Sequence, residues 1–150
     1  MKFYIATDHA GFAYKEFVKE YITGKGHEIV DLGPDSTDRV DYPDFGRKCA
    51  EHVIADQGSF GIVICGTGIG ISMAANKVVG IRTALCHDAY TAAMSRAHND
   101  AQILAFGERV VGKGVIESMI DAFVDTKFEG GRHAGRVAKI EACGYGANID

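Results

Sequence analysis

Short apolar runs alternate with segments of helical periodicity along the whole chain. The runs are rich in β-branched, aromatic and aliphatic residues and predict strands at 2–7, 28–32, 60–65, 82–86 and 102–106. The intervening segments predict helices over 12–22, 43–57, 71–77, 88–98 and 114–123, and a last helix with a frayed end is expected within 128–150. The run at 60–65, FGIVIC, is the most continuous and is expected near the centre of the sheet. This alternation predicts a parallel sheet covered by helices.

Length and composition narrow the class of protein. The 150 residues suit a single domain spanning 1–150, and 47% hydrophobic with 24% charged residues indicates neither disorder nor a fibrous repeat. A formal charge of -4 and the lack of a basic tract interleaved with aromatic residues argue against a nucleic-acid partner. No apolar stretch is long enough for a membrane span or a secretory leader, and the four cysteines show no C-x-x-C spacing. We therefore expect a cytoplasmic protein with free thiols that does not bind membranes.

The third predicted strand ends in a glycine-rich segment, CGTGIG, at residues 65–70. Ligands of open parallel sheets bind beyond the carboxyl ends of the strands, where Asp8 and His9 also fall. Alternate glycines between a strand and a helix let backbone N–H groups point into one small volume, which suits an anion. A P-loop is excluded because no G-K-[ST] follows, and Ile71 replaces the last glycine of G-x-G-x-x-G. Spacing alone leaves a small anion and a nucleotide as alternatives.

Cys65 stands at the mouth of this segment. A cysteine at the end of a buried strand is most often a core residue. The positive end of a helix, however, favours the ionised thiolate, which can remove a proton from a carbon next to a carbonyl group. The same backbone amides would then stabilise the oxyanion that forms.

Other polar residues have both structural and functional interpretations. Asp8 or His9 can cap the following helix, and 95–100, SRAHND, can be a helix end at which Asn99 takes a left-handed conformation. Arg132 and Arg136 lie one helical turn apart, so two guanidinium groups on one face can bind a phosphate, although such pairs are usually only solvated.

Taken together, these segments resemble ribose-5-phosphate isomerase B, a family that also contains the galactose-6-phosphate isomerase subunits. The matching pieces span nearly the whole chain and comprise DHAG at 8–11, DYPD at 41–44, CGTGIGISMAANK at 65–77, SRAHNDAQILAFGERVVG at 95–112 and FEGGRH at 128–133 with Arg136. The resemblance implies a doubly wound three-layer α/β sandwich with a five-stranded parallel sheet. It also implies a C-terminal helix that extends to a partner subunit, and a homodimer or dimer of dimers with sites at the subunit interface.

The resemblance also assigns roles to residues. Cys65 matches the base that moves a proton between C1 and C2 through a cis-enediolate, because Ile71 replaces the glutamate that some members use. His98 matches the residue that opens the furanose ring, Asn99 a donor to the enediolate, and Thr67 a contact of the sugar oxygens. The remaining residues match substrate-binding positions of the family. Gly66, Gly68, Ile69 and Gly70 match the backbone that surrounds the enediolate. His9, Arg109, Arg132 and Arg136 match the residues that bind the phosphate, and Asp8 and Tyr42 match groups that line the sugar. The family needs no metal or other cofactor.

The expected reaction is the interconversion of ribose 5-phosphate and ribulose 5-phosphate. The first alternative is a six-carbon substrate such as allose 6-phosphate or galactose 6-phosphate. A non-catalytic sugar-phosphate or nucleotide sensor would keep the anion cradle and the arginines but would not need Cys65, His98 and Asn99.

Overall fold

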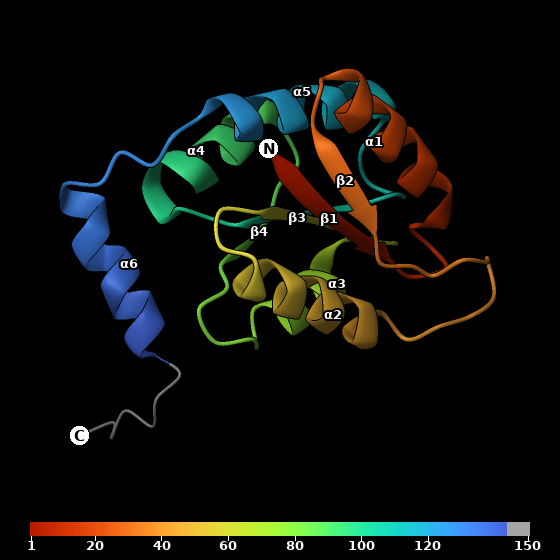
Figure 1. The fold of residues 1–150 in the computed structure, drawn as a ribbon, viewed down its shortest axis with the longest axis horizontal. Helices are drawn as coiled ribbons and strands as arrows, with labels where there is room; N and C mark the ends of the chain where they lie inside the picture. The colour runs from red at the N-terminus through yellow and green to blue at the C-terminus, as the bar shows by residue number, and fades with distance from the viewer. Residues whose placement is uncertain (144–150) are drawn as a thin grey trace.

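The computed structural model describes residues 1–143 and contains a five-stranded, entirely parallel sheet. Its strands are β1 (Lys2–Thr7), β2 (Glu28–Asp31), β3 (Phe60–Cys65), β4 (Thr83–Leu85) and β5 (Ile103–Gly107). They lie in the order β2-β1-β3-β5-β4 (Figure 1). The predicted parallel sheet and the position of FGIVIC in the middle strand are therefore confirmed.

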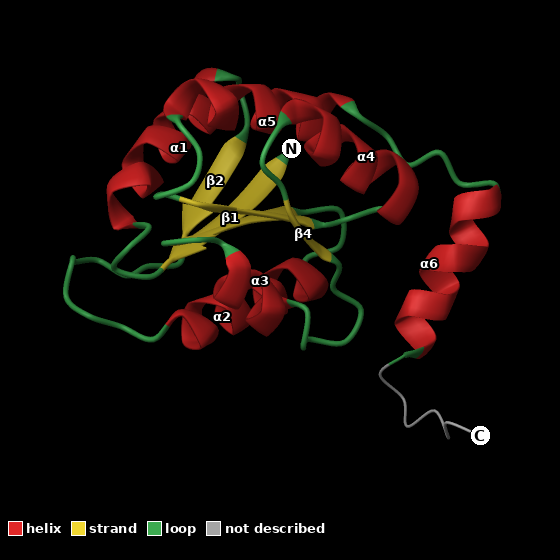
Figure 2. Ribbon diagram, turned by 180° about the vertical axis from the view of Figure 1, so that it is seen from behind, coloured by secondary structure: helices red, strands yellow, loops and turns green. Residues whose placement is uncertain are grey.

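Helices cover both faces of the sheet, which makes a three-layer sandwich (Figures 1 and 2). The helices are α1 (Phe12–Gly24), α2 (Tyr42–Ala55), α3 (Ile69–Ala75), α4 (Ala89–Asn99), α5 (Lys113–Asp125) and α6 (Arg132–Ala142). α1, α4 and α5 pack on one face, and α2 and α3 pack on the other. Along β1, Phe3 and Ile5 face the first layer while Tyr4 and Ala6 face the second. Burial of both faces is why the central strands β3 and β5 are continuous apolar runs.

The direction in which the chain winds changes between β1 and β3. From β1 the chain crosses to β2 on one side, whereas from β3 it crosses toward β4 and β5 on the other. At this point the two strands are still joined, because the main-chain N–H of Asp8 donates to the carbonyl of Ile64 at 3.2 Å. The carboxyl ends of β1 and β3, with Asp8 and Cys65, thus flank the position where open sheets bind ligands.

Helix α6 stands apart from the sandwich, beyond the end of α4 (Figures 1 and 2). The predicted C-terminal helix is confirmed, and its expected frayed end, residues 144–150, lies outside the described residues. In the part of the chain that the structure describes, no helix combines the length and the apolar character needed to cross a membrane.

Candidate active site

Cys65 is the last residue of β3, and its sulfur faces the glycine-rich loop. The N–H of Gly68 donates to Cys65 Sγ at 3.1 Å, although the side chain is only 4% exposed and packs in the core layer under α2 and α3. The cysteine is therefore buried, as a core residue is, and its sulfur accepts one amide of the loop. Ile71 is completely buried and carries no ionisable group.

The loop keeps its shape because a side chain is excluded at its centre. Gly68 has a φ of 77°, and a Cβ there would lie 2.6 Å from the carbonyl carbon of Phe106 in β5. Thr67 is exposed at the tip of the loop, and its hydroxyl accepts the N–H of Ile69 at 3.3 Å. α3 has only seven residues and begins at Ile69, directly after the loop.

Arg109 lies against this loop. A Cβ on Gly66 would be 3.1 Å from Arg109 Nη1, and the main-chain N–H of Arg109 donates to the carbonyl of Gly66 at 3.0 Å. The preceding Glu108 donates its N–H to the carbonyl of Cys65 at 3.0 Å, and its carboxylate accepts the N–H of Tyr14 in α1 at 3.2 Å. These contacts hold an exposed guanidinium group beside the amides.

Asp8, His9 and Tyr42 complete the group at this edge. The Asp8 carboxylate accepts the N–H groups of Ala10 and Gly11 at 2.9 and 3.0 Å, so it closes the turn before α1, whose N-cap is Gly11 without a side-chain cap. His9 Nδ1 lies 3.3 Å from the main-chain nitrogen of Val40 and 3.2 Å from its oxygen.

Tyr42, the first residue of α2, packs its ring over the loop. A Cβ on Gly70 would come within 2.5 Å of the Tyr42 ring. The carboxyl edge of the sheet thus carries Cys65, Thr67, Ile69, the loop glycines, Asp8, His9, Tyr42 and Arg109.

The remaining predicted residues form a second group at the end of α4 and on α6. His98 and Asn99 are the last two residues of α4, and Asp100 rather than Asn99 takes the left-handed conformation, with φ 46°. Arg132 and Arg136 are exposed on α6, one turn apart.

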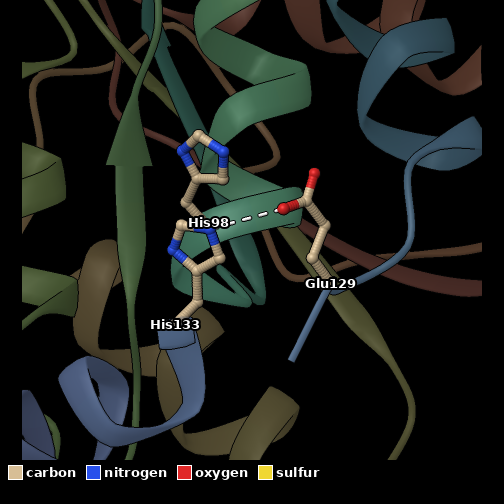
Figure 3. A group of neighbouring side chains, drawn as sticks. All are labelled: His98, Glu129 and His133. Atoms are coloured by element: carbon tan, nitrogen blue, oxygen red, sulfur yellow. Dashed lines mark ion pairs between the residues drawn. The ribbon is translucent and has the colours of Figure 1, made fainter. Parts of the chain in front are cut away.

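The two parts of this second group meet at a pair of histidines (Figure 3). The His98 ring stacks on that of His133, with centroids 4.2 Å apart and 10° between planes, and Glu129 Oε2 lies 3.3 Å from His133 Nε2. Burial lowers the pKa of His133, and the nearby charges of His98 and Arg132 lower it further. Donor atoms of these three side chains lie within 4.8 Å of one another, but the lone pairs of two parallel rings do not converge on one point, as zinc ligands must.

One chain does not bring the two groups together. α4 starts after the carboxyl end of β4 and runs back, so His98 lies at the amino edge of the sheet, near the start of β5. β5 has five residues, so the two edges are roughly 16 Å apart. Proton transfer needs the heavy atoms of the donor and the acceptor to lie about 3 Å apart.

The sequence does not predict the contacts of several residues at these sites. His133 belongs to the FEGGRH segment but carried no expected role, and Glu108 directly precedes Arg109 without any pattern that reveals its contact with α1. Arg82 and Glu141, which join α6 to the end of α4, lie 59 positions apart, and no local sequence signal connects them.

Comparisons with known proteins agree with this architecture. The family described as Ribose/Galactose Isomerase matches residues 3–140. Ribose-5-phosphate isomerase B of Escherichia coli (strain K12) is 44% identical over 135 residues, which is 90% of this chain and 91% of that protein.

Two solved structures are also similar. Clostridium thermocellum ribose-5-phosphate isomerase B superposes with a TM-score of 0.93 at 50% identity, covering 95% of this chain and 97% of the other. The Trypanosoma brucei type B ribose 5-phosphate isomerase gives a TM-score of 0.91 at 46% identity, with coverage of 95% and 97%. The chain belongs to the ribose/galactose isomerase family.

Proposed function

We propose that this isomerase interconverts D-ribose 5-phosphate and D-ribulose 5-phosphate, with Cys65 as the base. The observation that carries the proposal is the hydrogen bond from the N–H of Gly68 to Cys65 Sγ, which puts the proposed base against a backbone amide of the glycine-rich loop. Relatives that bear the name ribose-5-phosphate isomerase B, at 44–50% identity, support the choice of substrate.

The reaction needs no net oxidant. His98 opens the ring by removing the proton of the anomeric hydroxyl while the ring oxygen is protonated. The thiolate of Cys65 then takes the C2 proton, and the electron pair of that C–H bond forms the C1=C2 bond of a cis-enediolate as the carbonyl oxygen becomes negative. The loop amides and Asn99 stabilise that charge. Return of the proton to C1, with transfer of the hydroxyl proton from O2 to O1, gives the ketose.

The phosphate group is held by side chains from both groups of residues. His9 and Arg109 come from the carboxyl edge, and Arg132 and Arg136 come from α6. Guanidinium groups bind phosphate oxygens through paired, charge-assisted hydrogen bonds. The three guanidinium groups, with the His9 imidazole as a hydrogen-bonding group, therefore supply a local positive site on a chain whose formal charge is -4.

A homodimer, or a dimer of dimers, completes the site. The carboxyl edge of one subunit faces the α4 and α6 residues of its partner, which explains why a single chain keeps them apart. A cleft of about 740 Å³ between α6 and the β4 edge, lined by Asn99, Arg82 and Ile140 among others, offers space for that contact. Residues 1–150 act as one cytoplasmic isomerase domain without a cofactor, and a six-carbon sugar phosphate is the alternative substrate.

Proton NMR in deuterated water tests the proposal, with ribose 5-phosphate, allose 6-phosphate and galactose 6-phosphate supplied side by side. We expect loss of the C2 proton signal from ribose 5-phosphate together with formation of ribulose 5-phosphate. Cys65→Ala should abolish exchange yet still bind the phosphate ester. Cys49→Ala is the matched control, because burial raises the pKa of that thiol to about 12 and it lies outside the site. Undiminished exchange in Cys65→Ala would exclude Cys65 as the base.

A further inference from the structure

Helix α6 carries two of the proposed phosphate ligands but has few contacts that fix its position. Among the described residues it buries only His133, and Figures 1 and 2 show it standing outside the sandwich. At its beginning, His133 stacks on His98, and the nearby Glu129 donates its N–H to the carbonyl of Ala97 at 3.0 Å. These contacts fix one end of a helix that is about 16 Å long.

Among the described residues, the other end of α6 forms hydrogen bonds and ion pairs with the body through one guanidinium group. Arg82 Nη1 contacts Glu141 Oε1 near the end of α6, while Nε donates to the carbonyl of Asn99 at 2.8 Å and Nη2 to that of Asp100 at 2.9 Å. The main chain of Arg82 is itself fixed, because Gln102 donates its N–H to the Arg82 carbonyl at 3.0 Å. The Arg82 side chain is 13% exposed and that of Glu141 is 32% exposed, so water screens this pair only in part.

We propose that Arg82 and Glu141 are positioning residues that clamp α6 against the end of α4 and so set the distance of Arg132 and Arg136 from His98 and Asn99. The proposal rests on the proposed function, because it explains how the phosphate ligands are held ready for the substrate. Arginine suits this place, since its planar fork reaches two carbonyl groups and one carboxylate at the same time. Lysine offers a single ammonium group and cannot reproduce those directions.

The clamp predicts an effect on binding rather than on proton transfer. Without Glu141, the far end of α6 is released and the two arginines sample more positions before the phosphate arrives. Ordering them then costs part of the binding free energy, as for any ligand set that is not preorganised. Cys65 and the glycine loop are at the other edge of the sheet and keep their geometry.

Steady-state kinetics of Glu141→Ala with ribose 5-phosphate, and with inorganic phosphate as a competitive inhibitor, test the proposal. We expect KM and the inhibition constant of phosphate to rise together by roughly 3- to 10-fold, which is less than for loss of a charge-assisted hydrogen bond to the phosphate itself, because Glu141 acts only through the position of α6. We expect kcat to stay within about 2-fold, because the reacting groups are untouched. Glu141→Gln should be affected less, since its amide oxygen still accepts from Arg82.

Glu51→Ala is the control, because Glu51 forms an exposed ion pair with Arg47 at 3.6 Å on α2, away from the site, and should leave both constants unchanged. An unchanged KM and inhibition constant in Glu141→Ala, or a fall in kcat alone, would overturn the clamp. Calorimetric titration with inorganic phosphate separates the two proposals. If the wild type isomerises none of the sugar phosphates but Glu141→Ala binds phosphate more weakly, the proposed function fails and the clamp stands.

Discussion

Mixing two inactive variants should restore activity if each site is built from two subunits. The first variant is Cys65→Ala, which removes the proposed base from the carboxyl edge. The second carries Arg132→Ala and Arg136→Ala, which remove the proposed phosphate ligands of α6. Each lost arginine removes charge-assisted hydrogen bonds worth about 1.5–3 kcal/mol, so the second variant should lose roughly 10²- to 10⁴-fold in kcat/KM.

The magnitude of the recovery follows from the positions of the two lesions. They lie at opposite edges of the sheet, roughly 16 Å apart along β5. In a mixed dimer one site receives both lesions and the other receives none. Random exchange of equal amounts makes about half of the dimers mixed, so about a quarter of the wild-type activity should return.

The assay is co-refolding of the two variants from urea, followed by measurement of isomerase activity against each variant refolded alone. The matched control mixes Cys65→Ala with Arg109→Ala, whose lesions share the carboxyl edge, beside the glycine loop. Every site in that mixture keeps one lesion, so no recovery is expected. Recovery in the control, or none in the first mixture of well-folded dimers, would refute the site shared between subunits.

Five single substitutions test other parts of the protein. Arg132→Ala and Arg136→Ala, made singly, should each mainly raise KM, and unchanged affinity for sugar phosphate in both would remove them from the phosphate site. Gly68→Ala should cost about 2–4 kcal/mol in the free energy of unfolding, because it combines a left-handed φ with a Cβ 2.6 Å from a main-chain carbon of β5. Gly114→Ala has open space around its Cβ, so denaturant titration should find it no less stable than the wild type, and equal losses would contradict the steric argument. Burial keeps the pKa of His133 below its unfolded value, so stability present above about pH 6.5 should decline as pH falls, and less so in His133→Gln; equal declines in urea midpoint would exclude this histidine as the cause.

Much of the fold could be predicted because burial dictates the apolar pattern. Strands covered on both faces are apolar over most of their length, as β3 and β5 are, and all five runs became strands. The run at 82–86 shortened to Thr83–Leu85 because it is an edge strand with a partner on one side only, β5. The edge that carries Cys65 was also predictable, since parallel strands all end at the same side of the sheet.

The distance between Cys65 and the pair His98 and Asn99 can also be inferred from the topology of a parallel sheet. A helix that follows a parallel strand starts at the carboxyl edge and returns to the amino edge. His98 and Asn99, at the end of the helix after the fourth strand, therefore had to lie across the sheet from Cys65. The family resemblance had implied an interface site, and this topology gives the physical reason for it.

The sequence predicts a last helix, and the resemblance implies that it extends to a partner subunit, but neither predicts where it meets the body, because its apolar residues Val137 and Ile140 are not buried in the core of this chain. The helix buries one residue, His133, and short helices owe most of their stability in water to tertiary packing. Its place is set instead by contacts between residues far apart in the chain, Arg82 with Glu141 and His98 with His133. Because so few contacts hold this helix, loss of one of them should displace its proposed phosphate ligands more than a single substitution displaces the loop that holds Cys65. KM of Glu141→Ala reports how well α6 is held, and kcat of Gly68→Ala reports how well the loop is held. Measuring both would separate the two effects.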